Sequence, residues 1–471
     1  LDDLGGFTPQ NLSNIALAFS KAEIVDVSLF EKVAEHIVAL DDLTSFDPQA
    51  LSNIVWAFAN AGVVVVEDSK LFAKVADHVL ALDDLDGFRP QAISNLLWAF
   101  SKCEESHHRP KLFERVADHV VAITNLIEFN EQDLSNIVWA FASAKVTHPE
   151  LFEKVANHIT ALDHLGRFSP QSISNILIAF AKAGERNPEV FKKVAHHIVG
   201  LDDLSGFKPQ HLSNLVWAFA TANISHPILF EKISNEAIAR QHENEFNSQN
   251  VANLLWSYAA IGQLDPRLFS SLESVVANCF HECDSQELAN IAWAFAVANV
   301  NASGIFDGKS IFREKCIQMK EEFAVEALYQ LHQWSLWRRE LKSDDTYLPS
   351  SLEEQCRDAF ASTVPTPSAL QNDVVAELRS IGLDPEEEVL TESGYHLDAL
   401  VKVAGKRVGV EVDGPFHFVG KKPVGSTILK RRQVAAVEGI ALVSVPYWEW
   451  DALGRDRGER QRYLRSLLGI C

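Results

Sequence analysis

Four residues near the C-terminus have side chains that could together cleave a phosphodiester bond. Asp398 lies in the segment HLDALVKV, Glu411 and Asp413 lie in KRVGVEVD, and Lys430 lies in STILKRRQ. Carboxylates can hold a metal ion that activates water, and a lysine can neutralise the charge that develops on the phosphate. They are therefore candidate catalytic groups, with Asp398 and Glu411 as candidate ligands of Mg²⁺ or Mn²⁺.

A β-hairpin is expected to bring the three carboxylates together. Counting outward from a two-residue turn at Ala404 and Gly405 places Asp398 opposite Glu411, and a register shifted by one places Asp398 opposite Asp413. In either register the three carboxylates share a face, with opposed Cβ atoms about 5 Å apart. Like charges so placed destabilise a sheet, which favours a bound metal or a shared proton.

A helix and a further strand complete this unit. Ser426 or Thr427 can cap the helix and Gly439 can end it. The order of strand Val408–Asp413, helix, and strand Ile440–Pro446 predicts a parallel β-α-β crossover. The crossover would carry the lysine toward the C-terminal end of the first strand, beside the carboxylates.

The charge of this region is opposite to that of the rest of the chain. The whole chain of 471 residues has a formal net charge of −22, which excludes a protein that coats nucleic acid by bulk positive charge. From Tyr395 to Cys471 there are 13 basic and 8 acidic residues, a net charge of +5, so the remainder carries −27. Basic residues cluster around the helix start, where the helix dipole also favours anions. A phosphate backbone is therefore the expected ligand of Lys421, Lys422, Lys430, Arg431 and Arg432.

A repeat dominates the first two thirds of the sequence. Variants of the segment QALSNIVWAF recur eight times, and the shared asparagines are 37 to 42 residues apart: Asn14, Asn53, Asn95, Asn136, Asn175, Asn214, Asn253 and Asn290. Each copy predicts two helices, the first opening at a Pro-Gln pair and the second written as in LFEKVAEHIVAL. Two helices cannot bury their faces alone, so stacked neighbours must supply the core. The chain is thus predicted to be a mostly α protein, an α-solenoid followed by a small α/β domain.

Invariant repeat positions are interpreted as structural. We expect the Gln and Asn amides to form a ladder of hydrogen bonds to the backbone of adjacent repeats. The repeat tryptophans are expected to pack between repeats, although stacking on bases is the alternative. The variable residue at the end of each first helix would carry ligand specificity, as in helical-repeat RNA readers. The RNA-binding candidates there are Lys21, Asn60, Lys102, Lys182 and Thr221.

Three domains are predicted: residues 1–313 as the repeat array, 314–363 as a helical cap, and 364–471 as the α/β domain with its core at 408–467. Residues 1–4 match the LDDL linkers between repeats, so the sequence starts inside a linker. We therefore expect native sequence to precede residue 1. No run of 18 uninterrupted apolar residues occurs, so no membrane association is expected.

The α/β segment VGVEVDGPFHFVGKKPVGSTILKRRQVAAVEGIALVSVPYWEW resembles a RAP domain. It matches the family's V-D-G-P-x-H-F, T-x-x-K-R-R and P-Y-x-E-W motifs. The resemblance implies RNA binding, with His417 of the first motif among the binding residues, and a fold related to PD-(D/E)xK nucleases. The array is similar to the S-N-x-x-W-A-F-A repeats of FAST-kinase-like proteins and of an RNA-editing substrate-binding complex subunit.

These resemblances imply a protein that binds single-stranded organellar RNA, together with other RNA-processing proteins, in transcript maturation, stability or translation. The expected location is the mitochondrion, with the plastid as the alternative. Two other functions remain open: a metal-dependent endoribonuclease and a protein-binding scaffold. Asp413 stands where the nuclease fold has its lysine, and Lys430 would have to substitute from the helix. Without cleavage, no cofactor is expected.

Overall fold

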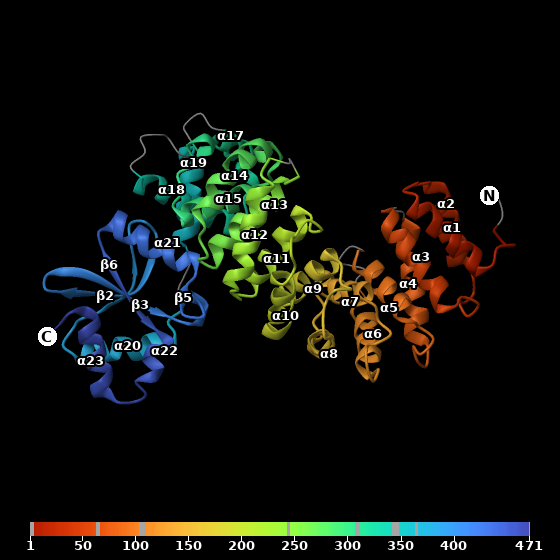
Figure 1. The fold of residues 1–471 in the computed structure, drawn as a ribbon, viewed down its shortest axis with the longest axis horizontal. Helices are drawn as coiled ribbons and strands as arrows, with labels where there is room; N and C mark the ends of the chain where they lie inside the picture. Colours follow the sequence, from red (N-terminus) through yellow and green to blue (C-terminus); the bar gives the residue numbers. More distant parts are fainter. Residues whose placement is uncertain are drawn as a thin grey trace. The chain divides into compact units, whose positions relative to one another are not determined.

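The computed structural model describes residues 4–62, 66–102, 109–242, 245–306, 311–341, 348–362 and 366–470. Two compact units are present, Leu1–Ala222 and Asn223–Cys471. The described part is mostly helical, and its strands lie near the C-terminus (Figure 1). An α-solenoid followed by a small α/β domain is therefore confirmed. The predicted boundary at residue 364 lies outside the described residues, and the three-domain division stays a prediction.

The first unit consists of two-helix repeats. The first helices of its repeats are α1 (Pro9–Lys21), α3 (Pro48–Ala61), α5 (Pro90–Ser101), α7 (Glu131–Ala144), α9 (Pro170–Lys182) and α11 (Pro209–Thr221). The second helices are α2 (Val27–Ala39), α4 (Val66–Ala81), α6 (Pro110–Ala122), α8 (Pro149–Ala161) and α10 (Pro188–Val199). Most first helices open with proline at the first position, where a missing N–H costs nothing.

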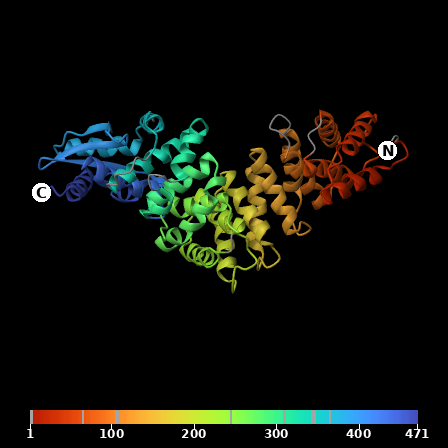
Figure 2. The same ribbon diagram turned by 90° about the horizontal axis from the view of Figure 1, so that it is seen from above.

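Successive repeats pack helix against helix. Within the first unit, each first helix lies against the next first helix, and each second helix against the next second helix (Figure 2). A phenylalanine of one second helix meets a phenylalanine of the following first helix edge to face, as Phe30 meets Phe58 at 4.9 Å between ring centroids. The pair recurs along the unit, for example at Phe113 and Phe141 with 5.1 Å. These pairs join each repeat to the next.

Basic side chains of second helices cap the helix before them. Lys154 Nζ of α8 donates to the carbonyl oxygens of Val121, at 2.6 Å, and of Ile123, at the end of α6. Lys74 makes the same contacts with Val38 and Leu40 at the end of α2. The last carbonyls of a helix lack intrahelical partners and carry the negative end of its dipole, so a cation there is stabilising. Some lysines of the array therefore stabilise the contact between neighbouring second helices.

The second unit continues the repeats. Its repeat helices are α12 (Pro227–Ala239), α13 (Ser248–Ala260), α14 (Pro266–Cys279) and α15 (Ser285–Ala298). They are followed by α16 (Ser303–Phe306), α17 (Ile311–Gln318), α18 (Val325–Glu340), α19 (Ser350–Ala361) and α20 (Ala369–Ser380). Helix α18 packs on α15 as one first helix packs on another, and Trp293 Nε1 of α15 donates to Gln333 Oε1 of α18 at 2.8 Å. Helix α18 therefore extends the row of first helices beyond the eight repeats.

A four-stranded sheet forms the core of the α/β domain, in the order β1-β2-β3-β6. The strands are β1 (Glu386–Leu390), β2 (His396–Val403), β3 (Lys406–Asp413) and β6 (Ala441–Pro446), and a small hairpin is formed by β4 (Phe418–Val419) and β5 (Lys422–Pro423). Strands β1, β2 and β3 are antiparallel in turn, and β3 and β6 are parallel, so the predicted crossover is confirmed.

The register of the hairpin follows the first of the two predicted alternatives. Val403 pairs with Lys406 across the turn, and the pairing runs outward to Ala399 and Val410. Asp398 is the next residue, and its side-chain Oδ2 accepts the backbone N–H of Val412 at 2.6 Å. The register that would place Asp398 opposite Asp413 is excluded.

Helices cover both faces of the sheet. On one face, α20 and α23 (Arg457–Leu468) pack on valines of β2, β3 and β6, with Trp450 of α22 (Tyr447–Ala452) among them. The other face packs against Leu336 of α18 and Val434, which follows α21 (Gly425–Gln433) in a short π-helical segment, Val434–Glu438. Gly439 ends this segment in the left-handed conformation, as predicted. The prediction that Ser426 or Thr427 caps α21 is wrong, because the N-cap is Val424 and makes no side-chain hydrogen bond.

Helix α21 also fixes the α/β domain to the last repeats. A Cβ on Gly425 would lie 2.0 Å from the carbonyl oxygen of Ala259 in α13, so only glycine fits there. Arg432 at the other end of α21 forms an ion pair with Glu340 of α18 and donates to the carbonyl oxygens of Ala296 and Val297 at the end of α15. The second unit is therefore one packed body in which the α/β domain closes the row of repeats.

Candidate nucleic-acid interface

The structure brings the four candidate catalytic residues together at one place. Asp398, Glu411, Asp413 and Lys430 interact electrostatically with one another, on neighbouring strands and on the helix above them. Glu411 and Asp413 point from β3 toward α21, where Lys430 forms an ion pair with Glu411 and Arg431 donates to Asp413 Oδ2 at 2.8 Å. Sequence reasoning thus predicted the neighbourhood of these groups correctly.

Each carboxylate at this place already has partners. Asp413 is 2 % exposed and, besides Arg431, contacts His417 Nδ1 at 3.1 Å and accepts a hydrogen bond from Ser444 Oγ. Burial raises the pKa of Glu411 to about 7, although the Lys430 ammonium partly opposes this rise. Burial also raises the pKa of Asp398. In the described part of the chain, no three His, Cys, Asp or Glu side chains are arranged to hold a metal ion.

The six candidate RNA-binding residues of the α/β domain divide into two groups. Lys430, Arg431 and Arg432 are half-buried and paired with Glu411, Asp413 and Glu340, respectively. Lys421 and Lys422 lie exposed in the β4–β5 hairpin, and His417 is exposed just before it. The predicted roles of all six in RNA binding stay predictions, but the two lysines of the second group have their charges directed to solvent.

In the first unit, the candidate residues follow the exposed edge of the first helices. Lys21, Lys102 and Lys182 are exposed at the ends of α1, α5 and α9. Asn60 is exposed at the end of α3, where its Nδ2 donates to Ser20 Oγ of the preceding first helix at 2.9 Å. Thr221 is half-buried at the end of α11. These five residues thus occupy equivalent positions in five of the six first helices of this unit.

The repeated Gln, Asn and Trp lie on the same helix faces as these end residues. In α5 the four are Gln91, Asn95, Trp98 and Lys102, spaced so that they follow one another along one side of the helix. We call the corresponding residues of all first helices of unit 1 the amide–tryptophan stripe: Gln10, Asn14, Leu17 and Lys21; Gln49, Asn53, Trp56 and Asn60; Gln91, Asn95, Trp98 and Lys102; Gln132, Asn136, Trp139 and Ser143; Gln171, Asn175, Ile178 and Lys182; Gln210, Asn214, Trp217 and Thr221.

The expected ladder of amides bonded to neighbouring backbone is wrong. Gln49 Nε2 donates to Asn53 Oδ1 of its own helix at 2.9 Å, and Gln286 does the same with Asn290 in unit 2 at 3.0 Å. The first helices already satisfy each other's packing through small and apolar residues, so the amides stay at the surface. The described side-chain hydrogen bonds of the invariant Gln and Asn residues therefore run to other amides.

The tryptophans pack between repeats and also reach the surface. Trp56 and Trp98 are half-buried, with ring centroids 5.8 Å apart. The Lys102 ammonium lies over two of these rings, 5.4 Å from the centroid of Trp98 and 4.6 Å from that of Trp139. Packing between repeats is confirmed for this pair, and the partly exposed rings stand beside a cation.

A polar pocket opens in the stripe between α7 and α9. Its volume is about 280 Å³, and polar side chains line it throughout: Glu131, Gln132, Ser135, Asn136, Arg167, Ser169, Gln171, Ser172 and Asn175. Arg167 supplies a guanidinium beside four amide groups. Sequence reasoning missed Arg167, because it lies in a linker whose place beside the stripe depends on the stacking of two repeats.

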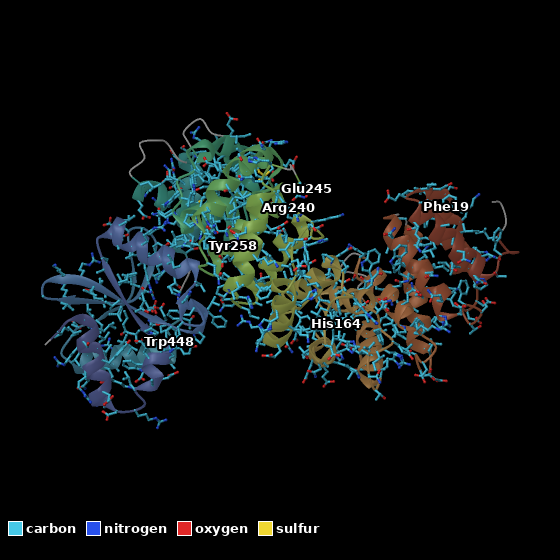
Figure 3. The ribbon with its side chains drawn as sticks, in the orientation of Figure 1. Phe19, His164, Arg240, Glu245, Tyr258 and Trp448 are labelled. Carbon is cyan, nitrogen blue, oxygen red and sulfur yellow. The ribbon has the colours of Figure 1, made fainter. Side chains whose placement is uncertain are left out.

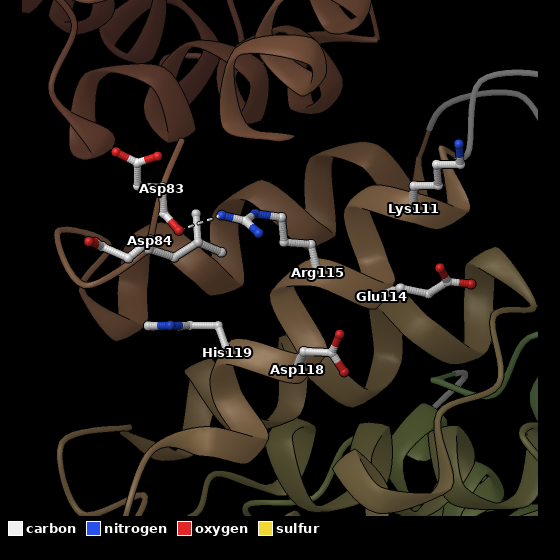
Figure 4. Close-up of a pocket in the computed structure, with 8 residues that line it drawn as sticks. Asp83, Asp84, Lys111, Glu114, Arg115, Asp118 and His119 are labelled. Carbon is white, nitrogen blue, oxygen red and sulfur yellow. Dashed lines mark hydrogen bonds between the residues drawn. The ribbon is translucent and has the colours of Figure 1, made fainter. Parts of the chain in front are cut away.

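The second helices offer different chemistry. A pocket of about 360 Å³ lies between α6 and the linker before α5, with four carboxylates in its wall, those of Asp83, Asp84, Glu114 and Asp118 (Figure 4). Arg115 in this pocket is turned to the backbone of the linker, where it donates to the carbonyl oxygen of Asp83 at 3.1 Å. The four carboxylates outnumber the two cations of the pocket, Lys111 and Arg115, so this pocket opposes the approach of phosphate.

The chain is thus a helical-repeat protein that ends in a RAP domain packed on its last repeats. The RAP-domain family model matches residues 410–467. The model of the RNA-editing substrate-binding complex 6 protein matches residues 85–358, which is more than half of the chain. The chain belongs to the RNA-editing substrate-binding complex 6 protein family. Both families point to RNA binding in RNA editing or processing. The described helices include none that is long and apolar enough to cross a membrane.

Proposed function

We propose that the protein binds single-stranded RNA along the amide–tryptophan stripe and acts in mitochondrial RNA processing. The observation that carries this proposal is the distribution of charge among the helices of unit 1. Helices α1, α3, α5, α9 and α11 contain no Asp or Glu. The second helices α2, α4, α6, α8 and α10 each contain at least one. Among the first helices of unit 1, α7 alone contains acidic residues, Glu131 and Asp133 in its first turn. Most of the negative charge on the helices of unit 1 is thus held away from the stripe.

The chemistry of the stripe suits an unpaired nucleic acid strand. Amides donate to and accept from ribose hydroxyls, phosphates and base edges, and tryptophan faces accept stacked bases of any type. Lys21, Lys102 and Lys182 supply positive charge at one end of the stripe. The repeated amides would contact the strand uniformly, and the variable helix-end residues would differ from base to base.

The family name supports the choice of ligand, since it refers to binding of RNA-editing substrates. Location in the mitochondrion, a role in transcript maturation, stability or translation, and work beside other RNA-processing proteins belong to the same proposal. Binding in this way needs no cofactor, and Mg²⁺ or Mn²⁺ would be needed only for cleavage. Crosslinking in cells followed by RNA sequencing tests the location, because recovery of nuclear-encoded transcripts alone would contradict it.

Replacement of Lys102 and Lys182 by alanine is expected to weaken RNA binding roughly tenfold. Each lysine that meets a phosphate releases a counterion, so the slope of log K against log salt should fall in magnitude by about 1.4 for the two. Fluorescence anisotropy of a labelled oligouridine RNA, measured over a series of salt concentrations, checks both values.

The matched control is a double replacement of Lys111 and Lys192, which are exposed on the second helices α6 and α10. It removes the same charge from the same unit and should leave affinity and salt slope nearly unchanged. Equal losses for the two double variants would mean that the RNA does not follow the stripe.

A further inference from the structure

Two aromatic residues of the RAP domain stand at positions that the family motifs leave unspecified. Phe416 is the variable residue of V-D-G-P-x-H-F, and Trp448 is the variable residue of P-Y-x-E-W. Phe416 is 72 % exposed and Trp448 is half-buried. The specified aromatics Phe418 and Trp450 are instead 5 % and 1 % exposed. The aromatic residues that the motifs specify are thus packed in the core, whereas Phe416 and Trp448 reach the surface.

Parallel strands bring the two aromatics to one edge of the sheet. Phe416 lies in the short 3₁₀ helix Pro415–His417 directly after β3. Trp448, which is labelled in Figure 3, lies at the start of α22 directly after β6. Asp413 and Pro446, the last residues of the two strands, are paired in the sheet. The ring centroids of Phe418 and Trp448 are 4.4 Å apart, which joins the two segments. In open α/β sheets, ligands bind at this carboxyl edge.

Positive charge accompanies the aromatic residues. Lys421 Nζ lies 5.9 Å from the ring centroid of Trp448, and Lys422 is exposed in the same hairpin. Of the nearby carboxylates, Asp413 is buried and paired with Arg431. Glu449, which follows Trp448, is exposed and accepts a hydrogen bond from Tyr463 Oη. The surface therefore combines π faces with the exposed ammonium groups of Lys421 and Lys422.

We propose that Phe416, His417, Lys421, Lys422 and Trp448 form a second RNA site, which we call the aromatic–lysine surface. An unpaired base stacks on Phe416 and Trp448, and the lysines neutralise the flanking phosphates. The inference rests on the proposed function, since it gives the same RNA a second contact. It assigns RNA binding to the variable motif positions and the hairpin, while the K-R-R motif residues hold the RAP domain together and to the repeats.

Two RNA probes, one with bases and one without, should distinguish base stacking on Phe416 from phosphate binding. In the full chain, Phe416→Ala is expected to weaken binding of a labelled oligouridine RNA about fivefold, because stacking of one base is lost. Binding of an abasic oligonucleotide of equal length, which has phosphates and no bases, should not change. Phe416→Leu, which keeps an apolar side chain without a π face, should behave as the alanine variant, and Phe416→Trp should bind as the wild type does.

The lysines should act on both probes. Replacement of Lys421 and Lys422 by alanine is expected to weaken binding of oligouridine and of the abasic strand alike, and to reduce the salt slope. Because Phe416 and both lysines are exposed, these variants should unfold at the wild-type urea concentration.

Two results would overturn the inference. One is a Phe416→Ala protein that binds oligouridine as tightly as the wild type, and the other is an equal loss on both probes. If Lys102 and Lys182 prove necessary while Phe416→Ala has no effect, the aromatic–lysine surface fails and the stripe stands. If the wild type binds neither probe, the proposed function fails and the second site fails with it.

Discussion

Replacement of Gly425 by alanine is expected to lower the free energy of unfolding of unit 2 by about 3 kcal/mol. The new Cβ would lie 2.0 Å from the carbonyl oxygen of Ala259, 2.8 Å from its carbonyl carbon and 3.0 Å from Val297 Cγ1. Two of these three atoms belong to backbone, so relief requires α21 to move away from α13. Urea unfolding followed by circular dichroism measures the change in midpoint.

The control for this prediction is Gly414→Ala. Gly414 has φ of −73°, and a Cβ there would meet nothing within 4 Å. Alanine at this position should leave the midpoint within a few tenths of a kcal/mol of the wild-type value. Equal midpoints for the two variants would show that α21 does not dock tightly on α13.

A second variant tests whether the whole length of α21 contributes to docking. Arg432→Met removes the ion pair with Glu340 and the hydrogen bonds to the last carbonyls of α15. If Gly425 and Arg432 secure the same interface, the double variant should lose less stability than the two single variants together, because the first change already releases the helix. Strict additivity would indicate two independent contacts.

Local sequence signals predicted most of the architecture. The eight repeats, the Ala404–Gly405 turn and the parallel crossover could be predicted because each helix, strand and turn has its own local signal of periodicity or turn chemistry. The docking of α21 has no such signal. Arg432 and Val297 are 135 residues apart in sequence, and their contact exists because the row of repeats presents the C-terminal ends of α13 and α15 to the RAP domain. The cluster of basic residues around the helix start made Arg432 an expected phosphate ligand. In the structure, Arg432 instead pairs with the Glu340 carboxylate and donates to two backbone carbonyls.

The same limit applies to the candidate site. Strand pattern placed Asp398, Glu411, Asp413 and Lys430 together, but it could not show which cation each carboxylate meets. The exposure of the aromatic side chains could not be predicted either, since the sequence does not show that Phe416 is at the surface and Phe418 is in the core. The amides of the stripe were expected to find backbone partners because buried amides must, but they are exposed or half-buried at the surface of the first helices, where they need no such partners.

Glu411→Gln is expected to remove much of the pH dependence of stability of unit 2 between about pH 4.5 and 7. In the folded chain, burial raises the pKa of Glu411 from 4.5 to about 7. Within this window Glu411 binds more protons in the folded chain than in the unfolded chain, so its contribution to wild-type stability falls by about 3 kcal/mol as pH rises. Glutamine does not titrate, so its curve should be flatter, and urea midpoints across the window measure the difference.

The control for this titration is Glu386→Gln in β1, whose exposed side chain should leave the curve unchanged. A wild-type curve no steeper than the Glu411→Gln curve would contradict the raised pKa of buried Glu411, which the Lys430 ammonium opposes only in part. The same measurement separates an ion pair from a metal site. A cation held by Asp398 and Glu411 would stabilise the folded chain in proportion to its concentration and compete with protons. Because Lys430 already pairs with Glu411, we expect the wild-type curve to be the same with and without Mg²⁺.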